Sequence, residues 1–267
     1  MRLYDGMLVH QSQSDDGVIE VVDDGDIRSL HFGTFPRQSC MSLEVPHSLE
    51  LTYTEAMMAA LLINSDPKRV LVVGLGGGSL VKYLLHYFPE CQIDVVEYRH
   101  DVVKVAHGYF QVPEYDDRLK IHVGDGYLFV QEQFYKDEIG YDMLLVDAYD
   151  HMGMAASVGI QAFFDACAGL LTPDGVMSIN LWGTNRPMFK QSMARINESF
   201  EGRSLVLPVE DKGNVICLAT RRLITQSNLK RLKRSVDDLE ALFQINLPKS
   251  LYELTRRNRP ILGKLFL

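Results

Sequence analysis

The sequence lacks the features that mark membrane-spanning, secreted and zinc-bound proteins. No apolar run approaches the roughly 20 residues of a membrane-spanning helix, and the opening stretch MRLYDGMLVHQSQSDDG has no apolar core of signal-peptide length. Cys40, Cys91, Cys167 and Cys217 are scattered, without a C-x-x-C pair, which argues against zinc and against a disulfide framework. We therefore expect a cytoplasmic protein that holds no metal and whose cysteines are buried apolar thiols.

Basic residues are also few compared with acidic ones. The chain has 27 Lys and Arg against 35 Asp and Glu, for a net charge of −8. Because contacts to phosphates need basic patches, this balance argues against a nucleic-acid partner. An acidic protein suits a small cationic partner better. The 267 residues suffice for one large domain or for one domain with a small appendage.

The pattern of apolar residues divides the chain into three parts. Apolar runs on both sides of Asp23-Asp24-Gly25-Asp26 predict a β-hairpin, and we assign residues 1–48 to a small N-terminal β-domain. Residues 47–64 predict a helix that Asp66-Pro67 ends. Residues 49–220 are assigned to an α/β domain and residues 221–267 to a helical tail. In that tail four basic residues lie between apolar ones; they favour a solvated face, and an anionic partner is the alternative.

Strands alternate with helices in the α/β domain. Uninterrupted apolar strands in such an alternation predict a parallel sheet covered by helices on both faces. Strands are predicted at 69–74, 92–97 and 119–125, within 141–150, and at 175–182, 204–210 and 214–220. Helices are predicted at 79–88, 101–110 and 160–171, the last of them ending at Thr172-Pro173-Asp174-Gly175.

A glycine-rich loop follows the first of these strands. Gly74, Gly76 and Gly78 spell G-x-G-x-G, whereas a dinucleotide fingerprint would need a glycine where Ser79 stands. The pattern therefore favours S-adenosylmethionine over NAD, since glycines let the backbone approach a ligand closely with positive φ. The alternative is a tight turn that binds no ligand.

Acidic residues follow the next two strands. Glu97 ends the second strand, 23 residues after Gly74, where a carboxylate can accept hydrogen bonds from ribose hydroxyls. Asp125, within Gly124-Asp125-Gly126, is expected at the carboxyl edge of the sheet. It can accept a hydrogen bond from an adenine amino group or cap the following helix, and the sequence leaves both roles open.

Two more acids follow the fourth strand, in the stretch VDAYDHMG. Asp147 and Asp150 are three residues apart at the same expected edge, and a close pair of carboxylates favours a cationic guest. Asp147 is placed to accept a proton from an ammonium group, or to hold an amine while it attacks carbon next to a sulfonium. Capping of a loop by Asp147 and solvation of Asp150 are the structural alternatives.

Together these residues resemble the polyamine aminopropyltransferases, the spermidine synthase family, over about residues 18–220. That family has a small N-terminal β-domain before a class I methyltransferase-like, Rossmann-like sheet. Its motifs G-G-G-D-G-G, V-E-I-D, G-D-G and D-S-S-D-P-x-G align with Gly74–Ser79, VEYR, Gly124–Gly126 and DAYDHMG. Its Y-[HQ]-E motif resembles Tyr53-Thr54-Glu55, and Gln38 aligns with a glutamine of its β-domain.

The resemblance implies a role for each aligned residue. Asp147 would be catalytic, and Asp150 and Tyr53 would bind the amine substrate. The residues implied in nucleoside binding are Gly74, Gly76, Gly77, Gly78, Glu97, Asp125, Gly126 and Gln38. The donor would be decarboxylated S-adenosylmethionine, the acceptor a diamine such as putrescine, and the assembly a homodimer.

One departure bears on the reaction. Where the family loop carries an Asp that binds the donor's amine, this chain has Gly77. Loss of that carboxylate would weaken binding by on the order of a few kcal/mol and would relax discrimination against intact S-adenosylmethionine. Three hypotheses for the function therefore agree with the sequence. They are an aminopropyltransferase, a methyltransferase that uses S-adenosylmethionine, and a non-catalytic nucleoside- or polyamine-binding homologue.

Overall fold

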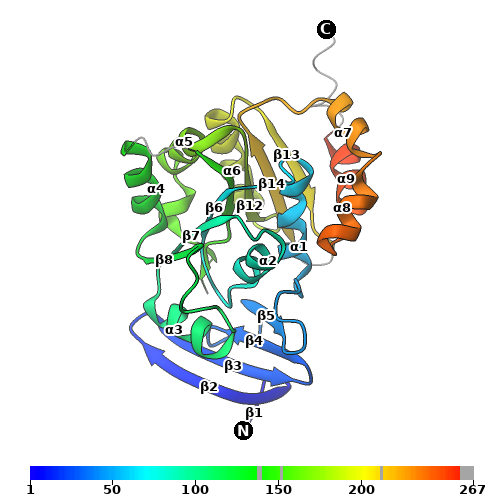
Figure 1. Cartoon of the computed structure of the whole chain (residues 1–267). Helices are drawn as coiled ribbons and strands as arrows, with labels where there is room; N and C mark the ends of the chain where they lie inside the picture. The colour runs from blue at the N-terminus through cyan, green and yellow to red at the C-terminus, as the bar shows by residue number, and fades with distance from the viewer. Residues whose placement is uncertain (137–139, 151–152, 211–212, 259–267) are drawn as a thin grey trace.

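A computed structural model describes residues 1–136, 140–150, 153–210 and 213–258 of the chain (Figure 1). It shows an antiparallel sheet at the N-terminal end of the molecule and a larger, mostly parallel sheet flanked by helices (Figure 1). In Figure 1 the N-terminal sheet lies below the large sheet, and the last three helices lie along one side of it.

The N-terminal sheet is antiparallel throughout and contains the predicted hairpin. Asp24 pairs with Ile27 across a turn in which Gly25 has a φ of 60°, a conformation that glycine adopts at little cost. The strand order follows the chain order. The strands are β1 (Arg2–Leu3), β2 (Gly6–Ser14), β3 (Gly17–Asp24), β4 (Ile27–His31) and β5 (Ser39–Ser42).

In the large sheet the strand order is β13-β14-β12-β9-β6-β7-β8. The strands from β6 to β9 and β12 are parallel, and β13 and β14 join antiparallel beyond β12. These strands are β6 (Arg69–Val73), β7 (Gln92–Glu97), β8 (Leu119–Val123), β9 (Tyr141–Val146), β12 (Leu171–Trp182), β13 (Ser204–Pro208) and β14 (Asn214–Thr220). A separate short hairpin is formed by β10 (Tyr149–Asp150) and β11 (Gly153–Met154).

Helices cover both faces of the large sheet (Figure 1). The α-helices are α1 (Thr52–Met57), α2 (Ser79–Tyr87), α3 (His100–Tyr109), α4 (Gly126–Tyr135), α5 (Gln161–Leu170), α6 (Arg186–Ser199), α7 (Gln226–Leu232), α8 (Val236–Phe243) and α9 (Leu247–Arg257). Two 3₁₀ helices are also present, η1 (Met58–Leu62) and η2 (Ala156–Gly159).

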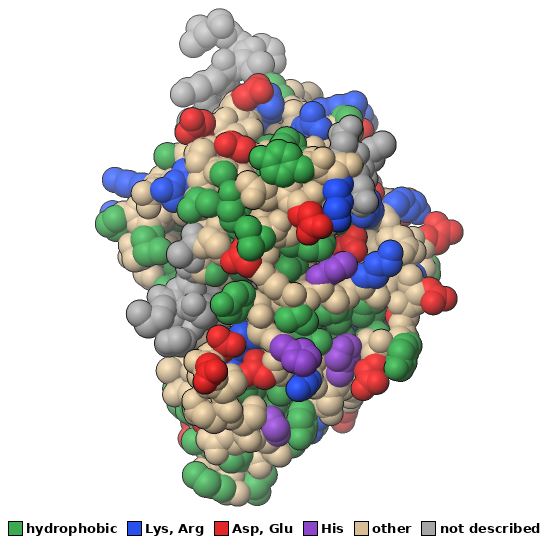
Figure 2. All heavy atoms as spheres, turned by 90° about the vertical axis from the view of Figure 1, so that its left-hand side faces the viewer, with side chains coloured by type: hydrophobic (Ala, Val, Ile, Leu, Met, Phe, Trp, Pro, Cys, Tyr) green, Lys and Arg blue, Asp and Glu red, His purple; other side chains and the backbone are tan. Residues whose placement is uncertain are grey.

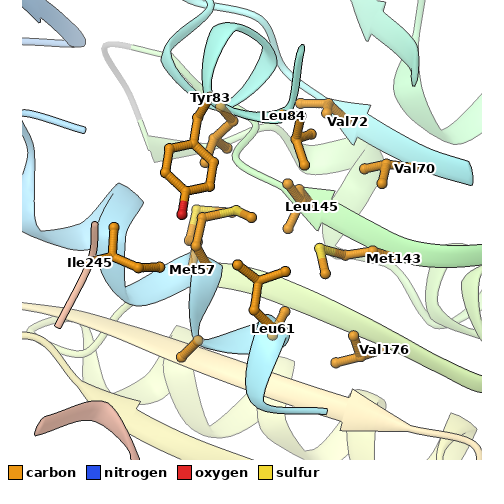
Figure 3. Close-up of a cluster of buried hydrophobic side chains, with 14 of the residues drawn as sticks. Met57, Leu61, Val70, Val72, Tyr83, Leu84, Met143, Leu145, Val176 and Ile245 are labelled. Atoms are coloured by element: carbon orange, nitrogen blue, oxygen red, sulfur yellow. The ribbon is translucent and has the colours of Figure 1, made fainter. Parts of the chain in front are cut away.

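The buried strands explain the two main cores, because successive side chains of a strand point to opposite faces. Val70 and Val72 of β6 pack on the face of α1, η1 and α2, where Figure 3 shows them with Met57, Leu61 and neighbouring side chains. Leu71 and Val73 pack on the opposite face, against residues of α5 and α6. Burial on both faces is the reason why these strands read as continuous apolar runs.

A third, smaller core fixes the N-terminal sheet to the large domain. Buried side chains of β3, β4 and β5 pack against the apolar side of α3 and its C-cap residue Phe110. Arg28 of β4 also donates a 2.8 Å hydrogen bond to the carbonyl oxygen of Tyr109. The N-terminal sheet is therefore attached to the large domain through α3.

The predicted helical tail forms part of the main core. Leu229, Phe243, Leu247 and Leu251 are buried in the same cluster as β6 and η1, and the hydroxyl of Tyr83 in α2 donates to the carbonyl of Phe243 at 2.8 Å. The basic residues between the apolar ones, Lys230, Arg231, Lys233 and Arg234, are exposed. This is the solvated face that the sequence favours.

Several elements differ from the sequence prediction. The helix expected over residues 47–64 is only α1 followed by η1, whose residues are all buried. The segment Thr172–Gly175 lies within β12, where a shift of register between Leu171 and Val176 accommodates it. Helix α6 has no counterpart in the prediction, because it buries only Ser192 and Ile196 and so carries a weak apolar pattern.

The surface and the cysteines agree with the composition. Figure 2 shows acidic, basic and apolar side chains intermixed on the face that carries the left-hand side of Figure 1. All four cysteines are buried and none of them forms a disulfide, which confirms that prediction. Among the described residues, no helix combines the length and the apolar character needed to cross a membrane.

Candidate active site

The predicted site residues meet where the parallel strands of the large sheet end. The amide of Gly74 donates to the carbonyl oxygen of Val96 at 2.9 Å, and the amide of Asp147 donates to that of Val73 at 2.9 Å. The amide of Gly124 likewise donates to the carbonyl of Glu97 at 2.9 Å. The carboxyl edge of the sheet therefore brings together Gly74, Glu97, Gly124 and Asp147, in the region where open α/β sheets bind ligands.

The loop between β6 and α2 requires its glycines. Gly74, Gly76 and Gly78 have φ values of 95°, 53° and 68°, which side chains rarely tolerate. A Cβ atom at Gly74 would lie 2.3 Å from the carbonyl oxygen of Asp147, and one at Gly78 would lie 2.2 Å from a methyl group of Val112. The loop can therefore pack directly against the catalytic candidate only because glycine stands at position 74.

A buried lysine also holds this loop by hydrogen bonds. The Nζ atom of Lys82 donates to the carbonyl oxygens of Gly77 at 2.6 Å and of Phe110 at 2.8 Å. Its side chain is buried, and this burial lowers the pKa of Lys82 to about 7. The Ser79 hydroxyl donates to the carbonyl of Cys40 in β5 at 3.0 Å. The loop is thereby tied both to the end of α3 and to the N-terminal sheet.

Glu97 is also bound to the loop. Its carboxylate accepts hydrogen bonds from the amides of Leu75 at 2.8 Å and of Arg99 at 2.9 Å, and from the amide of Gly76. Burial raises the pKa of Glu97, and these backbone hydrogen bonds oppose the increase. A carboxylate has about four acceptor positions, so these contacts leave room for a ribose hydroxyl. Ribose binding by Glu97 stays a prediction.

Asp125 caps α4. Its Oδ1 atom accepts hydrogen bonds from the amides of Tyr127 at 2.9 Å and Leu128 at 3.0 Å, which is the capping role that the sequence left open. A Cβ atom at Gly126 would lie 2.7 Å from a methyl group of Val73, so glycine lets the start of α4 pack closely on β6. Contact of Asp125 and Gly126 with adenine stays a prediction.

Asp147 lies at the centre of a polar cluster. The side-chain amide of Asn180 in β12 donates to its Oδ1 at 3.0 Å, and the hydroxyl of Tyr53 in α1 also hydrogen-bonds to it. Burial raises the pKa of Asp147 above its usual range, and the bonds from Asn180 and Tyr53 partly offset this increase. The Tyr53 hydroxyl oxygen also lies 3.4 Å from the carbonyl oxygen of Gln38. The fold therefore brings Tyr53, Gln38 and Asp147 together.

The second acid of the pair is described only in part. Asp150 lies in β10 and pairs through its backbone with Gly153 of β11. Its side chain lies outside what the structure describes. The predicted binding of an amine by Asp150 therefore stays a prediction.

Sequence reasoning missed Asn180, Ser39 and Lys82. Asn180 interrupts an apolar strand together with Ser178, two residues away on the same face, and both are buried. A pair of polar residues at this spacing near the end of a buried strand is the signal that could have revealed Asn180. No comparable signal marks Ser39 or Lys82, because their partners lie in distant parts of the sequence.

Position 77 is crowded in this structure. A Cβ atom there would lie 2.8 Å from both the Phe110 ring and the Ser39 hydroxyl. The side chain that the spermidine synthase family carries at this position therefore does not fit unless these neighbours move.

The strand order and the N-terminal sheet define a class I methyltransferase-like protein with a small β-domain. The chain matches the spermine/spermidine synthase domain family over residues 50–204, which is more than half of its length. It is 33% identical over 249 residues to a polyamine aminopropyltransferase of Chromobacterium violaceum, an alignment that covers 93% of this chain and 94% of the relative. The chain belongs to the spermine/spermidine synthase family, whose members are transferases.

Solved structures show the same fold. A spermidine synthase in complex with the transition-state analogue AdoDATO superposes with a TM-score of 0.71 at 18% identity, covering 97% of this chain and 89% of that one. Human methyltransferase-like protein 13, in complex with SAH, superposes with a TM-score of 0.65 at 24% identity, covering 73% of this chain and 94% of that one. These neighbours confirm the predicted fold class.

Proposed function

We propose that this protein transfers an aminopropyl group from decarboxylated S-adenosylmethionine to a diamine such as putrescine and releases methylthioadenosine. The observation that carries the proposal is the placement of Asp147. The backbone of Asp147 packs against Gly74 of the glycine loop, and its partly buried carboxylate accepts hydrogen bonds from Asn180 and Tyr53. Membership of the spermine/spermidine synthase family supports this reading of the site.

In the proposed reaction the acceptor amine displaces sulfur directly. Asp147 binds the amine as a cation and then takes its proton, which frees the nitrogen lone pair. A bond forms between this nitrogen and the aminopropyl carbon next to sulfur. The carbon–sulfur bond breaks with its electron pair going to sulfur, so that the sulfonium becomes a neutral thioether. A raised pKa makes Asp147 a better proton acceptor near neutral pH than an exposed aspartate.

The proposed donor site is the loop and the strand ends beside it. The backbone of Gly74, Gly76, Gly77 and Gly78 would lie against the nucleoside, with Glu97 on the ribose. Asp125 and Gly126 would lie near the adenine, and Gln38 would close over the donor from the N-terminal sheet. Most of the rate would come from holding two cations in line beside carboxylates.

The proposed acceptor site is the acidic side of the same edge. Tyr53 would orient the amine next to Asp147, and Asp150 would bind it as a cation. A small diamine matches these acids in charge. The cytoplasmic location and the homodimer stay predictions from the sequence.

The test is an assay with purified protein, putrescine and either donor. We expect methylthioadenosine and spermidine from decarboxylated S-adenosylmethionine and no S-adenosylhomocysteine from the intact donor. Failure to form methylthioadenosine with any diamine offered would contradict the proposal.

A methyltransferase is the second candidate, and position 77 favours it. No carboxylate at Gly77 is available to bind the donor's amine or to repel the carboxylate of intact S-adenosylmethionine. Calorimetric binding of the two donors separates the candidates: tighter binding of the intact donor would exclude the aminopropyltransferase. Binding of a nucleoside or polyamine without turnover would instead identify the third candidate, a binding protein.

A further inference from the structure

Two side-chain amides connect Asp147 with β14 across β12. The Nδ2 atom of Asn214, at the start of β14, donates to Oδ1 of Asn180 in β12 at 2.9 Å. Asn180 in turn donates from Nδ2 to Oδ1 of Asp147 at 3.0 Å. Asn180 is only 3% exposed, so its amide depends on these protein partners rather than on bulk water.

The sheet register places these three residues at one edge. Ile179 of β12 pairs with Val146 of β9, so that Asn180 stands next to Asp147. On the other side of β12, Trp182 pairs with Asn214 in the antiparallel direction. The relay Asn214–Asn180–Asp147 is thus built across three adjacent strands.

The two ends of the Asn180 amide differ, and this difference determines which end faces Asp147. An ionised carboxylate only accepts hydrogen bonds, whereas an asparagine has an amino group that donates and an oxygen that accepts. If the Asn180 amide turned over, its oxygen would face the Asp147 carboxylate, which is favourable only when that carboxyl is protonated. The donor from Asn214 occupies the Asn180 oxygen and opposes this rotation.

We propose that Asn214 is a positioning residue that holds the amino group of Asn180 on Asp147 and so keeps Asp147 ionised and ready to accept a proton. The inference rests on the proposed function in that it treats Asp147 as the base. Tyr53 faces Asp147 from α1 as a titratable group, Gly74 faces it with backbone atoms, and Asn180 is neutral. The side chain of Asp150, in β10, is outside what the structure describes.

Three single variants test the proposal. Asn214→Leu keeps a side chain of similar size but removes the donor. Asn214→Asp keeps the shape but only accepts when ionised, so it should draw the Asn180 amino group away from Asp147. Asn64→Leu is the matched control, because Asn64 is also partly buried but precedes β6 at the opposite end of that strand.

The direct readout is the titration of the Asp147 carboxyl, followed by NMR on protein labelled with ¹³C in its aspartates. The Asp147 signal is identified by its loss in Asp147→Asn. We expect the titration midpoint to rise by about one pH unit in Asn214→Leu, by more in Asn214→Asp, and not at all in Asn64→Leu. The acidic limb of the kcat/KM profile should move by the same amount.

The path of the effect is tested by a double variant. In an Asn180→Leu background, Asn214→Leu should add little further shift, since the connection to Asp147 is already broken. An Asp147 midpoint that is the same in wild type, Asn214→Leu and Asn214→Asp would overturn the inference. If the NMR midpoints shift but the activity profile does not follow them, the relay exists and the assignment of Asp147 as the base is wrong.

Discussion

On the glycine-loop side of the site, side chains bind mainly main-chain atoms, whereas the carboxylate of Asp147 is bound by other side chains. We call the first region the loop half, comprising residues 74–82 and Glu97, and the second the acid half, comprising Asp147, Asn180, Asn214 and Tyr53. Glu97 and Lys82 hold amides and carbonyls of the loop half. In the acid half, Asn180 and Tyr53 hold Asp147 by side-chain contacts.

This difference determines how each half responds to change. A side chain that binds the backbone fixes the shape of a loop, and its removal is expected to affect stability and donor binding. A relay of side chains fixes a protonation state, and its disruption is expected to affect rate and pH dependence. Four predictions test this comparison, in order of decreasing expected effect.

The largest effect is expected in the acid half, from Asp147→Asn. Because an amide cannot accept the proton of the attacking amine, turnover should fall by about 10²- to 10⁴-fold. Donor affinity, measured by calorimetry, should change by less than about threefold, since the loop half is intact. Unchanged turnover would show that Asp147 is not the base.

Lys82→Met tests the loop half through pH. The pKa of Lys82 is lowered to about 7 by burial, so between that pH and its ordinary value near 10.5 the unfolded chain binds a proton that the folded chain does not. The free energy of unfolding should therefore rise with pH across this window, by up to about 1.4 kcal/mol per pH unit. Below the window Lys82 is protonated in both states and adds nothing to this slope. Urea denaturation at several pH values measures the slope.

The contribution of Lys82 is the difference between the two proteins. Lys82→Met should lack this rise while other groups titrate as in wild type, so the wild-type curve minus the variant curve isolates it. Parallel curves for the two proteins from pH 7 to pH 10 would mean that burial does not lower the pKa of Lys82.

Glu97→Gln is expected to have the next largest effect. The glutamine amino group would face a backbone amide, where the carboxylate now accepts hydrogen bonds from Leu75 and Arg99. One buried donor would lose its acceptor, which costs about 1–3 kcal/mol. The free energy of unfolding and the donor affinity should both fall, whereas Glu114→Gln, at an exposed position, should change neither. Weaker binding of the donor without a loss of stability would instead indicate that Glu97 acts only by binding the ribose.

The smallest effect is expected from charge at position 77. Gly77→Asp and Gly77→Asn should both lose stability to the same extent, because either side chain meets Phe110 and Ser39. Between these two matched variants only the charge differs. The aspartate variant should prefer the decarboxylated donor over the intact one by roughly tenfold more than the asparagine variant does. Equal preferences would show that the loop does not discriminate between the donors by charge.

The sequence predicted the strands of the large sheet and the glycine loop well, because these depend on local pattern. Val70 to Val73 form an apolar run that is buried on both faces of the sheet, and the glycines of the loop adopt the positive φ values that their spacing suggested. The hairpin at Asp24 and Ile27 also follows from its turn residues.

The other features of the site depend on contacts between segments that are distant in the sequence. The sequence could not show that Glu97 binds the loop amides, nor that Lys82 reaches the carbonyl of Phe110. It left Asp125 open between capping and adenine binding, and the structure shows the capping bonds. It also gave no sign that the helical tail belongs to the main core, since packing against Tyr83 appears only in three dimensions.

By itself, the sequence determined which residues end the parallel strands, because short-range periodicity and glycine conformations are encoded locally. Those strand ends carry Gly74, Glu97 and Asp147 to one edge of the sheet. Only the tertiary structure decided what each carboxylate binds, since the partners come from other strands and helices. Asn180 contacts Asp147 and Asn214 contacts Asn180, and both contacts form only because β12 lies between β9 and β14.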